Sequence, residues 1–151
     1  MSERARVNTI TDHGCFGCGE QNPIGLRLAF FRDRDAVEAE FTPRPEHEGY
    51  AGLVHGGIIS ALLDEAMSWA VIADGRLAVT AQMSLRFRRP VEVGTPVRVR
   101  GRVIEERGRI VEARGELVDS DGTVLAEASG TFVRVSQAQQ RAWEERYLRR
   151  G

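Results

Sequence analysis

The feature that most constrains the fold is a long, almost wholly apolar segment, expected to form a helix from about Gly57 to Ala73. It follows the turn His55-Gly56-Gly57 and ends before Asp74-Gly75. Because a helix that is hydrophobic on most sides cannot face water, other parts of the chain must wrap it. A single antiparallel sheet that curls round the helix meets this requirement.

The alternation of apolar and polar residues predicts strands on both sides of this helix. Two strands come first and four follow, with hairpin turns at Gly108 and Asp121-Gly122. The expected strands are Leu26–Arg32, Ala36–Phe41, Ala78–Phe87, Val97–Glu105, Ile110–Val118 and Val124–Val135. The predicted fold class is therefore α+β, with one long central helix wrapped by a curved antiparallel sheet of about five to six strands.

A chain of 151 residues is long enough for one domain with its own core. We expect residues 1–13 to form a loose tail and residues 14–135 to form the domain. Residues 136–151 are polar and helix-prone, so they are expected to form a C-terminal helix.

The composition excludes several classes of partner. A net charge of −1 gives no reason to expect nucleic acid, and no apolar run is long enough to enter a membrane. The N-terminus lacks the apolar stretch of a secretory signal, and the two cysteines do not suggest a disulfide scaffold. These features predict a cytoplasmic protein.

The start of the helix carries the candidate chemistry. Backbone N–H groups at a glycine-rich helix start are unpaired and suit an oxygen that carries negative charge. Asp64 lies within the same apolar helix, where a carboxylate is costly unless something uses it. A donor site and a buried acid together indicate carbonyl chemistry.

Helix geometry predicts that the two groups act across subunits. Gly56 and Asp64 are eight residues apart, roughly 12 Å along a helix, which is too far for both to serve one carbonyl. We therefore expect an obligate homodimer with shared sites. Small residues surround Asp64 on its helix face and leave room for substrate or a second chain, namely Gly57, Ser60, Ala61 and Ser68.

The order of elements and four motifs resemble the hotdog-fold acyl-CoA thioesterases, in the branch of the phenylacetyl-CoA and 4-hydroxybenzoyl-CoA enzymes. The motifs are Cys15-Phe16-Gly17-Cys18-Gly19, Asn22-Pro23-Ile24-Gly25-Leu26, His55-Gly56-Gly57 with Asp64-Glu65, and Arg89-Pro90-Val91-Glu92-Val93-Gly94. The resemblance implies hydrolysis of an acyl- or aryl-CoA thioester, with no cofactor besides the coenzyme A that the substrate carries. It also implies subunits paired sheet edge to sheet edge, and it leaves open whether dimers pair into tetramers.

The resemblance also implies roles for four residues. Gly56 corresponds to the backbone donor that polarises the thioester carbonyl, and His55 to the residue that orients this group. Asp64 corresponds to the acid that activates water or attacks directly, and Thr80 to a hydroxyl that holds the water. Some relatives carry Asn or Gln six residues before the histidine as a second donor, where this chain has Gly49.

The remaining charged residues and histidines are candidates for other roles. Arg88 and Arg89 are candidates to bind the coenzyme A phosphates, or else belong with the other strand arginines on a solvated face. Glu65 is expected to pair with an arginine, with a role as the true base the alternative. His13 and His47 are expected on the surface.

Cys15 and Cys18 are expected to be small buried residues rather than metal ligands, because the chain has no second Cys/His pair to complete a zinc site. A zinc site shared across a dimer is the alternative. No metal is predicted.

Two other functions fit the same fold. One is a non-catalytic acyl-CoA binding or sensing protein, and the other is an enoyl-CoA hydratase or dehydratase. The acid inside the helix favours hydrolysis.

Overall fold

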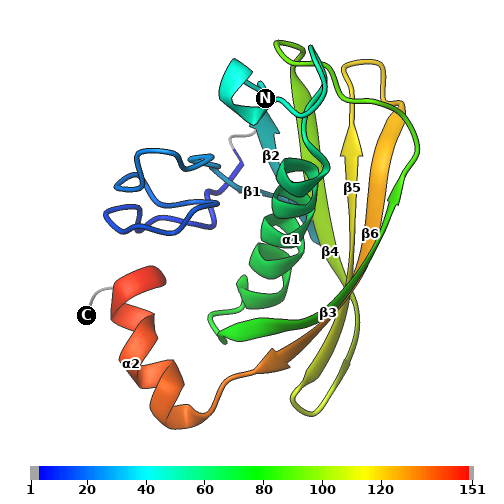
Figure 1. Ribbon diagram of the computed structural model, residues 1–151. Helices are drawn as coiled ribbons and strands as arrows, with labels where there is room; N and C mark the ends of the chain where they lie inside the picture. Colours follow the sequence, from blue (N-terminus) through cyan, green and yellow to red (C-terminus); the bar gives the residue numbers. More distant parts are fainter. Residues whose placement is uncertain (1–3, 150–151) are drawn as a thin grey trace.

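In the computed structural model, which describes residues 4–149, one helix lies in the concave face of a six-stranded antiparallel sheet (Figure 1). The strand order is β1-β2-β4-β5-β6-β3, so the long strand β3 lies at one edge. The strands are β1 Phe31–Asp33, β2 Ala36–Phe41, β3 Ala78–Phe87, β4 Val97–Arg107, β5 Ile110–Val118 and β6 Val124–Arg134. The helical segments are η1 Pro45–His47, α1 Gly56–Ile72 and α2 Gln137–Tyr147. The predicted fold class is confirmed.

Helix α1 contacts the sheet through backbone as well as side chains. A Cβ atom on Gly101 of β4 would lie closer than 3.0 Å to the carbonyl group of Ala66 in α1. Gly115 of β5 and Gly130 of β6 leave room in the same way for the side chain of Met67. Glycines on three neighbouring strands therefore let the helix settle into the sheet at its middle.

Arg134 holds the C-terminal end of α1. Its side chain is buried and donates to the carbonyl oxygen of Val71 at 2.8 Å and to that of Arg76. The guanidinium also pairs with Asp74 and Glu106. A cation is favourable here because the last carbonyl groups of a helix carry partial negative charge.

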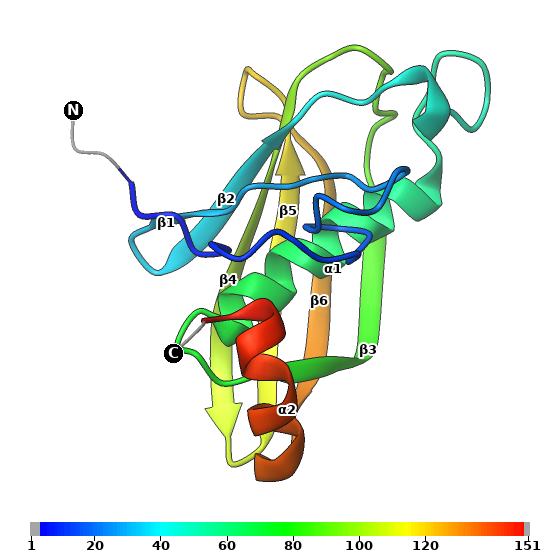
Figure 2. The ribbon, with the colours of Figure 1, turned by 90° about the vertical axis from the view of Figure 1, so that its left-hand side faces the viewer.

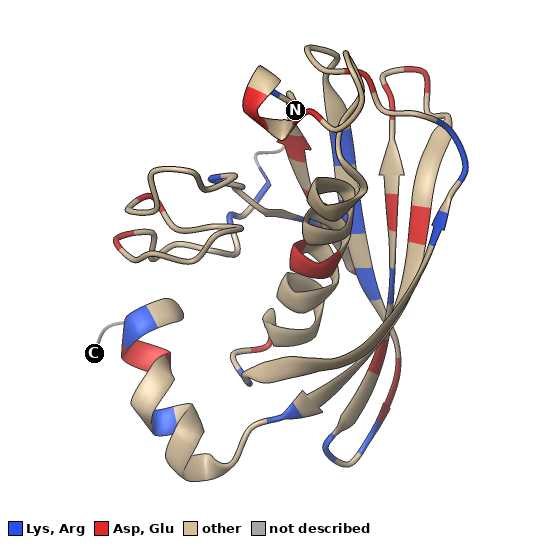
Figure 3. Ribbon diagram, in the orientation of Figure 1, with Lys and Arg blue, Asp and Glu red and all other residues tan. Residues whose placement is uncertain are grey.

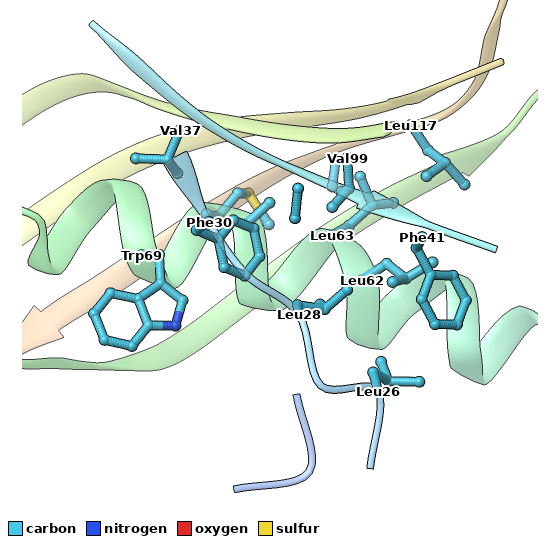
Figure 4. Packing of buried hydrophobic residues seen from close by; sticks show 14 of the residues in the cluster. Leu26, Leu28, Phe30, Val37, Phe41, Leu62, Leu63, Trp69, Val99 and Leu117 are labelled. Carbon is cyan, nitrogen blue, oxygen red and sulfur yellow. The ribbon is translucent and has the colours of Figure 1, made fainter. Parts of the chain in front are cut away.

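The N-terminal segment covers the side of α1 that faces away from the sheet. Figure 2 shows this segment crossing in front of α1, and Figure 4 shows Leu26, Leu28 and Phe30 packed against the helix from that side. The side chain of Asn8 is fully buried, donates to the carbonyl of Leu28 and accepts from the N–H of Phe30. We call residues 4–30 the N-terminal cover.

Two expectations about this segment are wrong. The expected tail is packed over residues 4–13, because Asn8 bonds to the backbone of the neighbouring segment. The expected strand at Leu26–Arg32 shrinks to β1, since the N–H groups of Leu26 and Leu28 donate to loop carbonyls instead of to a strand.

Helix α2 packs against the N-terminal cover and the end of α1. The side chain of Gln140 accepts from the N–H of Leu77 and donates to the carbonyl of Gly75. The ring of Tyr147 meets that of His13 edge to face at 4.9 Å. His13 is fully buried, so its expected surface position is wrong. Among the described residues, no helix is long and apolar enough to cross a membrane.

We expect Gly101→Ala to lower the free energy of unfolding by about 3 kcal/mol or more, because the added methyl group would push α1 off the sheet. Gly115→Ala is the matched control. Its methyl group would meet the movable side chain of Met67 at 3.2 Å and should cost about 1 kcal/mol. Urea unfolding of the two variants measures the difference, and equal losses would contradict the close helix approach.

Candidate active site

His55 caps the N-terminus of α1. Its Nδ1 accepts a hydrogen bond from the N–H of Gly57 at 2.8 Å, and its own N–H donates to the carbonyl of His47 at 2.9 Å. Since Nδ1 is the acceptor, the ring proton lies on Nε2, and the exposed ring offers this N–H to a ligand.

The cap leaves one backbone donor unused. The N–H of Gly57 is taken by His55 and the next two N–H groups bond to the His55 carbonyl, whereas that of Gly56 has no partner among the described residues. The ring of Phe87, at the end of β3, lies 3.7 Å from the position of a Cβ on Gly56. A free donor therefore points out beside an aromatic ring, at the positive end of the helix dipole.

Gly49 lies directly against His55. A Cβ atom at residue 49 would stand 3.1 Å from the Cα of His55 and 3.5 Å from its imidazole Cδ2. An Asn or Gln side chain at this position would therefore crowd the cap. The backbone and imidazole of His55 thus occupy the space next to residue 49.

A cavity of about 770 Å³ opens at the start of α1. Its walls are mainly apolar side chains from the loop before α1, from α1 itself and from the end of β3. It is lined by Glu48, Gly49, Tyr50, Leu53, Val54, His55, Gly56, Ile59, Phe87, Arg88, Arg89, Pro90 and Val91. Tyr50, Ile59 and Phe87 were not predicted as site residues, because no pattern in the sequence sets them apart. In the structure Tyr50 and Phe87 are large side chains exposed at 88% and 53%, as is typical of a binding surface.

Asp64 lies in the middle of α1, on the side of the helix that faces the edge strand β3. Its Oδ1 accepts a hydrogen bond from the hydroxyl of Thr80 at 2.7 Å, and both residues remain open to solvent. The register of β3 against β6 shifts between Thr80 and Gln82, and such bulges re-aim side chains beside functional sites. Figure 3 shows the acidic band in the middle of an otherwise uncharged helix.

The structure brings the expected site residues together in two groups rather than one. His55, Gly56, Arg88 and Arg89 line the cavity, whereas Asp64 and Thr80 lie outside its wall. Ser60 donates its hydroxyl to the carbonyl of Gly56 at 2.7 Å, and Ala61 and Ser68 are half-buried. One chain therefore holds the donor group and the acid group apart.

The two candidate arginines differ in their partners. Arg88 forms an ion pair with Glu127 at 2.6 Å, so its charge is already matched. The Arg89 side chain makes no hydrogen bond or ion pair with any described residue. Arg89 is thus the guanidinium at the cavity that is available to an anion.

Glu65 does not pair with an arginine, which corrects the sequence expectation. It points to the N-terminal cover, where the thiol of Cys15 lies 3.7 Å from its Oε1. Burial raises the pKa of Glu65 to about 8, with the charge of Cys15 adding to the effect. Glu65 is rotated by about 100° from Asp64 on the helix and does not face Thr80.

His47 is also buried rather than on the surface, at 3% exposure. Its Nδ1 accepts from the N–H of Arg44 at 2.9 Å, and its ring packs on Phe41. Desolvation, together with the charge of Arg44, lowers the pKa of His47. Because the His47 carbonyl holds the N–H of His55, this buried ring supports the cap of α1.

Comparison with known proteins places these residues in a family context. Residues 51–126, half of the chain, match the thioesterase superfamily. The bovine protein acyl-coenzyme A thioesterase THEM4 is 26% identical over 123 residues, which cover 80% of this chain and 51% of the relative. The chain thus spans about half the length of that curated relative.

Two solved structures share the fold. A mutant of the phenylacetic acid degradation protein PaaI from Thermus thermophilus is 27% identical with a TM-score of 0.66, over 73% of this chain and 95% of that chain. A hypothetical thioesterase from Streptococcus pneumoniae, solved with coenzyme A, is 20% identical with a TM-score of 0.68, over 73% of this chain and 87% of that chain.

We expect the stability of the protein to fall as the pH drops through 6.5, in part because of His47. Its pKa is lowered from 6.5 in the folded protein, so below this pH the unfolded chain binds the proton more tightly. In His47→Asn the amide oxygen can still accept from Arg44 but cannot titrate. The free energy of unfolding, measured by urea titration from pH 8 to about 5, should fall less steeply in this variant. Parallel curves would contradict the assignment.

Proposed function

This chain belongs to the thioesterase superfamily, and from that premise we propose that it hydrolyses an acyl-coenzyme A thioester to coenzyme A and a carboxylic acid. One observation carries the proposal. The free N–H of Gly56 opens into an apolar cavity, and further along α1 the carboxylate of Asp64 accepts from the hydroxyl of Thr80 on the edge strand β3. The names of the relatives, a thioesterase acting on acyl-coenzyme A and a structure holding coenzyme A, support the substrate class.

The residues divide the reaction between them. The thioester carbonyl accepts from the Gly56 N–H and from the Nε2–H of His55, so both donors meet the negative charge that develops on its oxygen. Asp64, held by Thr80, takes a proton from a water molecule, whose oxygen bonds to the carbonyl carbon. The tetrahedral intermediate then collapses, the carbon–sulfur bond breaks, and the coenzyme A thiolate leaves and takes up a proton.

The cavity suits the substrate in two respects. Apolar side chains such as Ile59 and Val91 offer a slot for an acyl or aryl group. Arg89 has no partner among the described side chains and suits a phosphate of the coenzyme A moiety. Coenzyme A enters as part of the substrate, and the mechanism uses no other cofactor. A cytoplasmic location and pairing of dimers into tetramers stay predictions.

We further propose that the working unit is a dimer formed through β3. This strand is ten residues long and mostly exposed, and it has no neighbour on its outer side within the described chain. Antiparallel pairing of β3 with its own copy about Met83 and Ser84 places Thr80 beside the partner's Phe87. Since Thr80 bonds to Asp64 and Phe87 lies beside Gly56, this register brings the acid of one subunit to the donor of the other.

Asp64→Asn should lower kcat/KM for acyl-coenzyme A hydrolysis by about 10²–10⁴-fold, because the amide cannot accept the proton of the attacking water. Free thiol released from a panel of aryl and fatty acyl-coenzyme A thioesters measures the loss. Asp121→Asn, at an exposed hairpin turn, is the matched control and should hydrolyse like wild type. Full hydrolysis by Asp64→Asn would refute the role of the acid. No thiol release by wild type, with coenzyme A still bound, would favour a sensor.

Mixing two inactive variants tests the shared site. Gly56→Pro removes the donor N–H at the first helical position, where proline is tolerated. The substitution should lower kcat by about 10²–10³-fold. After it is unfolded and refolded with an equal amount of Asp64→Asn, half of the dimers should carry one intact site. Hydrolysis should then recover to about a quarter of the wild-type rate. If each chain holds a complete site, mixing will restore nothing.

A further inference from the structure

A second cluster of reactive side chains lies on the other side of α1 from Thr80. The loop Cys15-Phe16-Gly17-Cys18 of the N-terminal cover passes over the helix at Glu65. The two sulfur atoms and a carboxylate oxygen of Glu65 all lie within 4.8 Å of one another. The Cys15 Sγ to Glu65 Oε1 distance is 3.7 Å, and both cysteines are free thiols.

The loop is shaped around this cluster. A Cβ atom on Gly17 would lie closer than 3.0 Å to the side chain of Glu65, so only glycine lets the carboxylate reach the sulfur atoms. The N–H of Gly19 closes the loop on the Cys15 carbonyl at 2.9 Å.

One polar atom in the cluster is unexplained by the protein alone. Oε2 of Glu65 is buried and has no hydrogen-bond partner among the described residues. A buried carboxylate oxygen without a donor costs free energy, and no arginine within residues 4–149 forms an ion pair with Glu65 to offset it. The mechanism above does not use Glu65, so the hydrolytic reaction does not account for it.

We propose that Cys15, Cys18 and Glu65 bind a zinc ion. Tetrahedral zinc with bonds of about 2.3 Å to sulfur and 2.1 Å to oxygen separates neighbouring ligand atoms by about 3.6 Å for sulfur and oxygen and about 3.8 Å for two sulfurs. The Cys15–Glu65 distance of 3.7 Å matches this spacing. Thiolates with one carboxylate suit zinc, whereas magnesium and calcium prefer oxygen ligands alone.

The site is complete within one chain and leaves the fourth position to water. Cys18 is buried at 5% exposure, but Cys15 is half-buried, so solvent reaches the cluster from the side of Cys15. The third ligand comes from the helix rather than from a second Cys/His pair, so the spacing of cysteines and histidines in the sequence does not reveal it. A bound ion would fasten the N-terminal cover to α1 one residue from Asp64.

Cobalt(II) binding to the reduced, EDTA-treated full chain tests the proposal. We expect one cobalt ion per chain, a thiolate-to-cobalt charge-transfer band, the intense visible bands of tetrahedral cobalt, and loss of these bands when zinc is added. Zinc at about 100 times its Kd should raise the Tm by roughly 5–10 °C.

Variants identify the ligands. Glu65→Gln keeps the shape of the side chain and both thiols, and should weaken zinc binding by about tenfold or more. Cys15→Ser should abolish much of the charge-transfer band. Asp64→Asn is the matched control, since this neighbouring acid faces Thr80 and should leave cobalt binding unchanged.

Three outcomes would overturn the proposal: a reduced wild-type chain that gives no thiolate–cobalt band, a Glu65→Gln variant that binds like wild type, and a Cys15–Cys18 disulfide whose reduction restores no ion binding. Because the readouts are spectroscopic and thermal, they stand whether or not the chain hydrolyses thioesters.

Discussion

The backbone contact between α1 and β4 fixes the geometry on which both candidate sites depend. With the carbonyl group of Ala66 lying against Gly101, the helix cannot rotate or slide without breaking its fit to the sheet. This contact therefore decides which side of α1 looks toward β3 and which side lies under the N-terminal cover. It also sets where the capped start of the helix meets the end of β3. The proposed substrate chemistry at the start of the helix and the proposed ion binding at its middle both depend on this one packing contact.

Strand β3, at the edge of the sheet, contacts both the acid and the donor of α1. Its beginning carries Thr80, bonded to Asp64, and its end carries Phe87, against Gly56. A long exposed edge strand is a liability in a monomer because its unpaired backbone invites other strands. In the proposed dimer, pairing of β3 with its own copy would remove this liability and would complete two shared sites. The separation of donor and acid within one chain would then follow from the two-fold assembly.

Much of this fold was predictable because its signals are local. Alternation of apolar and polar residues predicted β2 with the bounds that it has, and the glycine-rich turn with a following apolar run located α1 and its free donor. The N-terminal cover was not predictable, because buried Asn8 holds it through side-chain bonds that have no periodic signature. The burial of His47 and the partners of Glu65 depend on contacts between distant segments, which no spacing in the sequence encodes.

Asp64 and Glu65 both carry a carboxyl group on α1, but the helix places the two groups in different surroundings. They are adjacent in sequence, but the 100° turn per residue sends one toward a solvent-open hydroxyl and the other under a glycine-rich loop. The half-buried carboxylate of Asp64, beside the exposed Thr80, stays open to solvent and free to exchange a proton with water. The carboxylate of Glu65 lies against two thiols and has a buried oxygen without a donor, which a bound cation would stabilise. The placement of the two carboxylates, rather than their chemistry, therefore separates the group suited to catalysis from the group suited to holding an ion.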